Sequence, residues 1–137
     1  MTNFAAHDGD RNAGAEVLLA LPWPPSANRL WRSPNKGPLR GRHLLSPEAR
    51  QYKNKAHVIL EALEVEPIPG RVAVDMTAHP PDRRRRDLDN LIKIILDSLK
   101  GRAFGDDSNV VDLHIRQGAV EPGGLIRVRV RPITSIP

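Results

Sequence analysis

The segment Asp87–Gly101, DLDNLIKIILDSLKG, decides the fold because it carries the clearest helical pattern in the chain. Six of its apolar residues fall at i, i+3, i+4, i+7, i+8 and i+11, which places these six on one side of an amphipathic helix. They are Leu88, Leu91, Ile92, Ile95, Leu96 and Leu99. Gly101 is a natural stop, since glycine adopts the left-handed conformation that often follows a helix. We therefore predict a helix from about Asp89 to Lys100 with one face in the core.

Shorter segments on both sides of this helix have the patterns of strands and of a second helix. Ser46-Pro47 combines an N-cap residue with proline at the first helical position. The predicted strands are Val17–Leu21 (buried), Arg71–Ala78, Val111–Ile115 and Leu125–Arg131, and the second helix runs from Pro47 to Leu63. The order β-α-β-α-β-β predicts a single small α+β domain, with a mixed sheet packed against two helices. Ser26–Leu45 is predicted to be a basic loop.

Composition limits the class of protein. The chain has 137 residues, of which 39% are hydrophobic, so it can bury one core as a soluble domain. The absence of cysteine excludes disulfides, thiolate zinc sites and cysteine nucleophiles. The apolar runs are too short to span a membrane, and the N-terminus lacks the pattern of a signal peptide. We expect a cytoplasmic protein whose residues 1–15 form a disordered tail and whose residues 16–137 form the domain.

The net charge of +5 favours an anionic partner, and 16 of the 21 cations are arginine. The cations cluster in the segment Arg29–Lys55, in the run Arg83–Arg86, and at Arg127, Arg129 and Arg131. Each cluster is either a solvated surface or a site for a polyanion, and four consecutive arginines favour the polyanion. The predicted DNA-binding residues are Arg29, Arg32, Arg40, Arg42, Arg83, Arg84, Arg85 and Arg86.

Two carboxylates and one ammonium converge where the central helix begins. Asp87 and Asp89 can share a side only at the junction between extended chain and helix, and Lys93 follows Asp89 by one turn. One interpretation is helix capping with an ordinary Asp89–Lys93 ion pair. The other is a metal-dependent phosphodiesterase site, because Mg²⁺ binds carboxylates together with substrate phosphate.

A second acidic pair, Asp106-Asp107, precedes the third predicted strand. It is either turn chemistry or the source of one further metal ligand. The intervening helix would be about 18 Å long at 1.5 Å per residue. A shared site would therefore require the following loop to fold back along the helix.

Three segments give the chain a resemblance to a known family. They are Leu21–Ser26 (LPWPPS), Pro81–Leu91 (PDRRRRDLDNL) and Asp106–Asp112 (DDSNVVD). Together with Lys93 they resemble, in order, the motifs of RusA-type Holliday junction resolvases. The resemblance covers about residues 17–131.

This resemblance implies a homodimeric α+β nuclease of DNA recombination and repair. It implies that the enzyme uses Mg²⁺ or Mn²⁺ to cut four-way DNA junctions by paired symmetric nicks. The family's catalytic residues fall on Asp87, Asp89, Lys93 and Asp107, and its metal ligands on the three aspartates. Two other interpretations of the charge pattern are a non-catalytic module that binds branched DNA and a nuclease for a different DNA structure.

Overall fold

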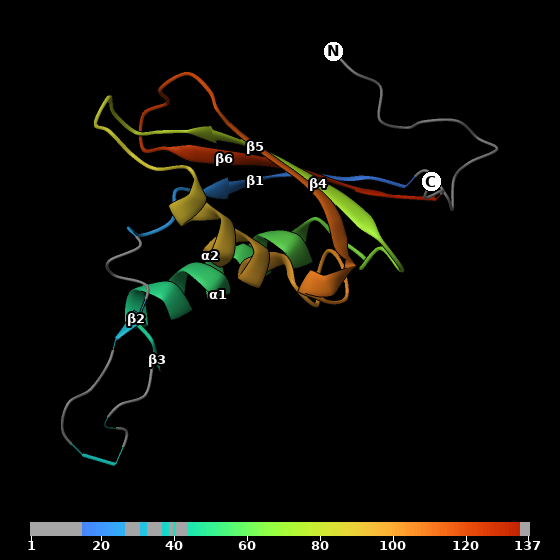
Figure 1. The fold of residues 1–137 in the computed structure, drawn as a ribbon, viewed down its shortest axis with the longest axis horizontal. Coiled ribbons are helices and arrows are strands. Elements are labelled where there is room, and N and C mark those ends of the chain that lie inside the picture. The colour runs from blue at the N-terminus through green and yellow to red at the C-terminus, as the bar shows by residue number, and fades with distance from the viewer. Residues whose placement is uncertain (1–14, 27–30, 33–36, 39, 41–43, 135–137) are drawn as a thin grey trace.

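A four-stranded mixed sheet with two helices on one face forms the body of the protein (Figure 1). The computed structural model describes residues 15–26, 31–32, 37–38, 40 and 44–134. Its elements are β1 (Val17–Pro22), β2 (Trp31–Arg32), β3 (Leu44–Leu45), α1 (Pro47–Ala62), β4 (Val72–His79), α2 (Asp89–Leu99), the 3₁₀ turn η3 (Asp107–Asn109), β5 (Val110–Gln117) and β6 (Leu125–Pro132). The predicted α+β architecture is confirmed, whereas the predicted N-terminal tail lies outside the described residues.

The strand order is β1-β6-β4-β5. β6 pairs antiparallel with both β1 and β4, and β4 pairs parallel with β5. A parallel pair needs a crossover connection, which α2 supplies. At one end of the sheet, Leu125 of β6 pairs with both Pro22 and His79. The chain therefore leaves β1 and β4 at the same end.

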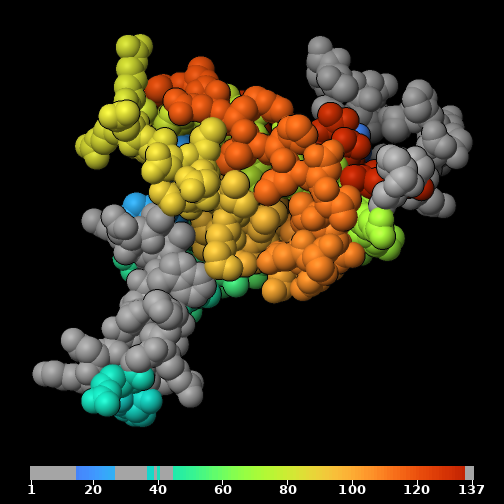
Figure 2. Space-filling view, in the orientation of Figure 1, coloured from blue at the N-terminus to red at the C-terminus, as the bar shows by residue number. Residues whose placement is uncertain are grey.

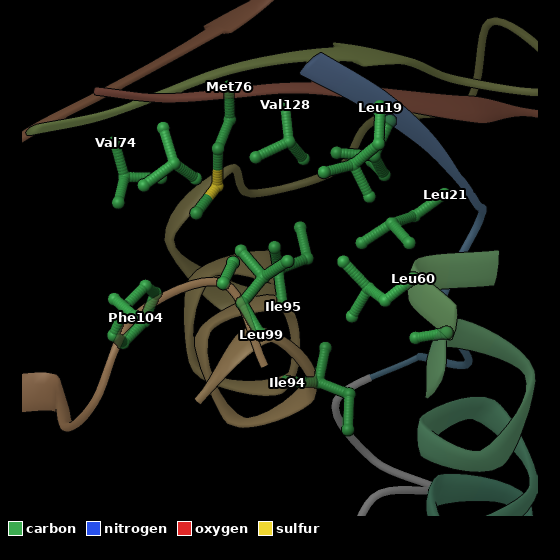
Figure 3. Close-up of a cluster of buried hydrophobic side chains, with 14 of the residues drawn as sticks. Leu19, Leu21, Leu60, Val74, Met76, Ile94, Ile95, Leu99, Phe104 and Val128 are labelled. Atoms are coloured by element: carbon green, nitrogen blue, oxygen red, sulfur yellow. The ribbon is translucent and has the colours of Figure 1, made fainter. Parts of the chain in front are cut away.

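The core lies between the sheet and the two helices (Figure 3). Leu19, Met76 and Val128 descend from three strands toward Ile95 and Leu99 of α2. These five side chains are at most 8% exposed. Burial of this apolar area is the main source of stability, at about 25 cal/mol per Å².

The ends of the helices follow the predicted signals. The Ser46 hydroxyl accepts a hydrogen bond from the Ala49 amide at 3.1 Å, so α1 begins at Pro47 as expected. α2 ends at Leu99, and Gly101 adopts a φ of 78°, which favours glycine. The chain then turns through Phe104, which is fully buried.

The buried face of α2 differs from the predicted stripe. Ile94 and Ser98 are buried, whereas Ile92 and Leu96 are only half-buried. α2 packs against α1 as well as the sheet, so its contact face turns toward α1. The Ser98 hydroxyl donates to the Ile94 carbonyl oxygen at 2.7 Å, which satisfies this polar group inside the core.

Two strand predictions needed correction. The apolar run Val17–Leu21 was expected to be buried, but β1 is an edge strand that buries Leu19 and Leu21 and exposes Leu18 and Ala20. Within the predicted basic loop, β2 pairs with β3 over two residues each. Such a short ladder leaves no alternation in the sequence.

The third predicted strand is correct, but two of its apolar residues lie outside the core. Val111 is 50% exposed and Leu113 is 38% exposed. β5 forms the edge of the sheet beyond β4, where the helices cover it incompletely. No helix within the described residues is long and apolar enough to cross a membrane.

We expect Phe104→Ala to lower the free energy of unfolding by about 3–5 kcal/mol, because it leaves a cavity between the end of α2 and the sheet. Urea denaturation measures this change. Val58→Ala is the control: Val58 is 68% exposed, and its truncation should change stability by less than about 0.5 kcal/mol. Equal effects of the two changes would contradict this account of the core.

Candidate active site

A cleft of about 470 Å³ opens where the chain leaves β1 and β4. The segment after β1 forms one wall, and the segment from Pro81 to the first turn of α2 forms the other. The lining residues are Trp23, Pro24, Pro25, Ser26, Pro81, Arg85, Arg86, Asp87, Asn90 and Leu91. The pairing of β1 and β4 with β6 thus brings together two segments that are about 60 residues apart in sequence.

Trp23 is fixed at the base of this cleft. A Cβ added to Gly124 would lie 2.7 Å from Cβ of Trp23, so only glycine permits this close approach. The Tyr52 hydroxyl donates to the Pro22 carbonyl oxygen at 2.7 Å and ties α1 to the end of β1. Burial raises the pKa of Tyr52, which keeps this hydroxyl protonated. The wall of the cleft formed by residues 22–26 is therefore anchored from two sides.

The four consecutive arginines divide into two groups. Arg86 is 24% exposed, lies 5.6 Å from the centre of the Trp23 ring, and pairs with Asp82 at 2.8 Å. It also donates to the carbonyl oxygens of Asp82 and Arg84, both at 3.2 Å. In contrast, Arg83, Arg84 and Arg85 are exposed. Arg86 shapes the loop, and the other three present charge to solvent.

Asp82 organises the turn that carries these arginines. Its carboxylate accepts from the Arg84 amide at 3.0 Å and pairs with the Arg86 guanidinium. The hydrogen bond from Arg86, followed by that from the Arg84 amide, lowers the pKa of Asp82. The ionised form of this residue is therefore the one that holds the loop.

Asp87 and Asp89 do not cap α2. The N-cap residue is Leu88, which has helical dihedral angles, and no side chain caps the helix. Both aspartates are exposed, and neither makes a side-chain hydrogen bond or ion pair with another described residue. The described ion pairs do not include Asp89 with Lys93. The capping interpretation therefore fails. Asp87 lines the cleft, and Asp89 lies two residues further on, at the first residue of α2.

The two residues of the second acidic pair, Asp106 and Asp107, have different environments. Asp106 caps η3: it accepts from the amide and the hydroxyl of Ser108, at 3.0 and 2.8 Å. These hydrogen bonds lower the pKa of Asp106. Asp107 has a buried oxygen, Oδ1, with no hydrogen-bond partner among the described residues. Asp106 therefore holds the turn, whereas Oδ1 of Asp107 is left without a partner in the part of the chain that the structure describes.

Asp107 does not join Asp87 and Asp89 within one chain. α2 has 11 residues and is therefore about 16 Å long. Asp89 is the first residue of α2 and Asp87 lies two residues before it, whereas η3 follows the other end of the helix (Figure 1). At that end, Lys100 lies 4.0 Å from Asp106. Across the described ranges, no three His, Cys, Asp or Glu side chains are placed to hold a metal ion together. The loop after α2 does not fold back along the helix.

The other predicted cationic residues have different environments. Arg29 and Arg42 lie outside the described residues, as does the side chain of Arg32, and Arg40 is exposed. On the open face of the sheet, Arg129 pairs with Glu16 at 2.7 Å and Arg131 lies 3.9 Å from Asp112. This supports the interpretation of the β6 arginines as a solvated ionic surface.

Trp23 and Asn90 line the cleft but were not predicted from the residues as site residues. A tryptophan between prolines at the end of a strand is the sequence signal that could have found the first of them. Asn90 follows Asp89 directly and gives no separate signal.

A basic α+β domain with uncommitted carboxylates beside exposed arginines has the features of a nuclease. The profile of the family "Endodeoxyribonuclease RusA" matches residues 22–131. The crossover junction endodeoxyribonuclease RusA of Escherichia coli K12 is 39% identical over 114 residues, which are 82% of this chain and 91% of that protein. That of phage HK97 is 32% identical over 123 residues, 88% and 98% of the two chains. The chain belongs to the endodeoxyribonuclease RusA family.

We expect Asp82→Asn to flatten the pH dependence of stability in acid. Because the folded pKa of Asp82 is lowered, its contribution is present above its ordinary pKa and is lost as the pH falls through the lower, folded value. Thermal unfolding of the wild type and of Asp82→Asn, measured between neutral and strongly acidic pH, reports this loss of stability. Added salt should make the contribution of Asp82 smaller, because it screens the charges. Parallel profiles of the two proteins would contradict the role of Asp82.

Proposed function

We propose that this protein is a Mg²⁺- or Mn²⁺-dependent endonuclease that resolves four-way DNA junctions by paired symmetric nicks, in DNA recombination and repair. The observation that carries the proposal is a pair of exposed carboxylates that do not cap α2: Asp87, which lines the cleft together with Arg85, and Asp89, which begins α2 two residues later. The names of the relatives, crossover junction endodeoxyribonucleases, support this choice of substrate.

The residues at the cleft fit a hard divalent cation. Mg²⁺ takes oxygen ligands, commonly one or two carboxylates together with water and substrate phosphate. Asp87 and Asp89 supply such carboxylates, and the unpartnered Oδ1 of Asp107 is a further oxygen of this kind. When bound, the metal would activate water and stabilise charge on the phosphate.

Lys93 and the exposed arginines bind the phosphates in this proposal. Lys93 lies one turn after Asp89 on α2, and in this proposal its ammonium orients the scissile phosphate and stabilises the developing charge on it. Arg83, Arg84 and Arg85 attract the DNA backbone next to the cleft. Contacts of this type read backbone shape rather than sequence, which suits a branched substrate.

The position of Asp107 gives the homodimer a chemical role. Because α2 separates Asp107 from Asp87 and Asp89 in one chain, we propose that Asp107 of a second copy supplies the third carboxylate of the site. A two-fold dimer would then contain two equivalent sites, each with Asp87, Asp89 and Lys93 from one chain and Asp107 from its partner. Two symmetric sites match a two-fold symmetric junction.

We expect Asp89→Asn to reduce junction cleavage by about 10³-fold while junction binding stays equal or becomes tighter, since a charge that repels phosphate is removed. The measurement uses an immobile four-way junction labelled on one strand, with Mg²⁺ or EDTA, beside a linear duplex. Glu61→Gln is the matched control, because Glu61 is an exposed acid on α1 away from the cleft.

Three results separate the alternatives. Cleavage of the junction alone, dependent on Mg²⁺ and on Asp89, supports the proposal. Tight binding that ignores Mg²⁺, with no cleavage, favours a non-catalytic DNA-binding module. Equal cleavage of the duplex indicates a nuclease for another DNA structure. Wild-type rates in Asp89→Asn would remove this carboxylate from the site.

We expect a mixture of Asp89→Asn and Asp107→Asn subunits to recover nicking that neither variant shows alone. If the sites are shared between chains, the mixed dimer has one doubly altered site and one intact site. It should nick one strand of the junction after the two variants are unfolded and refolded together. If each chain holds its own complete site, the mixed dimer stays inactive, which would contradict the shared arrangement.

A further inference from the structure

The face of the sheet opposite the two helices carries a groove of about 540 Å³ (Figure 1). The groove lies over the middle of the strands, whereas the cleft lies at the end where β1 and β4 finish. Figure 2 shows the surface of the segment before α2, in yellow and yellow-green, projecting at one end of the molecule. Three arginines, Arg116, Arg127 and Arg129, line the groove. The proposed nuclease site uses none of them.

Two of these arginines are already held by carboxylates of the same face. The guanidinium of Arg116 donates to both oxygens of Asp75, at 2.7 and 3.3 Å, and to the Thr77 hydroxyl at 3.2 Å. The guanidinium of Arg129 donates to both oxygens of Glu16, at 2.7 and 3.0 Å. Bidentate pairs of this type fix the orientation of a guanidinium as well as neutralise it. These two positions of the groove are therefore ordered and carry little net charge.

Arg127 has no such partner. In the register of the sheet it stands between Ala20 of β1 and Thr77 of β4. It is exposed and makes no hydrogen bond or ion pair with another described residue. Both of its neighbours have short side chains, so a ligand in the groove can approach its guanidinium. The groove therefore presents one uncompensated positive charge between two neutralised ones.

An apolar patch lies next to this charge. Leu18 is 36% exposed on the same face, and Ala20 beside it is also exposed. Leu18 pairs with Arg129, so it is the diagonal neighbour of Arg127, at a Cα separation of about 7–8 Å. In an extended peptide, side chains two residues apart point the same way and lie about 6.6 Å apart. The groove therefore matches a carboxylate and an apolar side chain that are separated by one residue.

DNA fits this groove poorly. A duplex carries one negative charge per about 1.7 Å of its axis, and its binding depends on several cations without partners. Here Asp75 and Glu16 would face the phosphates, and only Arg127 is uncompensated in the groove. The exposed run Arg83–Arg85 at the cleft offers three adjacent cations instead. The charge of the groove is complementary to a single carboxylate rather than to a polyanion.

We propose that this groove binds an extended segment of a partner protein. An aspartate or glutamate of the segment pairs with Arg127, and a bulky apolar side chain two residues away packs on Leu18 and Ala20. Because the groove lies away from the cleft, a bound partner leaves the cleft open. The groove is thus a docking surface for an acidic and apolar peptide, and this inference does not rest on the proposed nuclease activity.

The test titrates the full-length protein, labelled with ¹⁵N, with a synthetic peptide. The probe is acetyl-Gly-Ser-Asp-Gly-Phe-Ser-Gly-amide, whose only charge is the aspartate. We expect saturable shifts of the amide signals of Ala20, Thr77 and Arg127, and none at Asn90 in the cleft. Replacing the peptide's aspartate by asparagine, or its phenylalanine by alanine, should each weaken binding about 10-fold.

Protein variants identify the two contacts. Arg127→Gln should also weaken binding about 10-fold, and the aspartate and asparagine peptides should then bind it equally, because the two changes remove the same ion pair. Leu18→Ala should reduce the effect of the phenylalanine in the same way. Arg71→Gln is the matched control: Arg71 is an exposed arginine outside the groove, and its replacement should not change affinity. The spectra themselves show whether each variant is folded.

Three results would overturn the proposal. The first is the absence of saturable shifts at millimolar peptide. The second is equal binding of the aspartate and asparagine peptides by the unaltered protein. The third is a shift of the groove signals by duplex DNA, together with weaker junction binding by Arg127→Gln, which would place the groove on the path of the DNA.

The same variants separate this inference from the proposed function. We expect Arg127→Gln to cleave free junctions at the rate of the unaltered protein, since the groove is remote from Asp87 and Asp89. Peptide binding by a protein that cleaves no junction supports the groove, and the proposed function alone fails. Junction cleavage by a protein that does not bind the peptide overturns the groove and leaves the proposed function standing.

Discussion

The packing of α2 against the sheet is the constraint on which the site depends. Ile95 and Leu99 are fully buried beneath Met76, so the helix cannot rotate or slide without opening the core. The fixed helix α2 has Asp89 and Lys93 near its first turn, and the chain after its last turn leads to Asp107. The same packing that stabilises the domain therefore keeps the two groups of carboxylates apart.

The pairing of β1 and β4 with β6 controls the electrostatics of the cleft. It sets the segment with Trp23 against the run of arginines, so Arg86 stacks over the ring and binds Asp82. Arg86 is held with little conformational freedom, and the three arginines before it remain exposed. Because Arg86 is held in place, the loop presents the positive charges of the other three arginines beside Asp87. This arrangement does not require an ordered partner for each of these charges.

Local patterns predicted much of this arrangement. The signals at Ser46-Pro47 and Gly101 set the helix ends correctly, because caps and left-handed residues act within a few residues of sequence. The sequence did not reveal the β2–β3 ladder, the rotation of α2 toward α1, or the exposure of Val111. Each depends on which element lies alongside, and alternation within one strand does not report its neighbours.

By itself the sequence determined the α+β class, the element order, the basic charge and the candidate acids at Asp87, Asp89 and Asp107. Only the tertiary structure decided which acid does what. In it, neither Asp87 nor Asp89 caps α2, Asp106 caps η3, and a buried oxygen of Asp107 has no hydrogen-bond partner among the described residues. The physical reason is that the same carboxylate group can cap a helix, form an ion pair or bind a metal ion. Only the groups brought near it in space distinguish these roles.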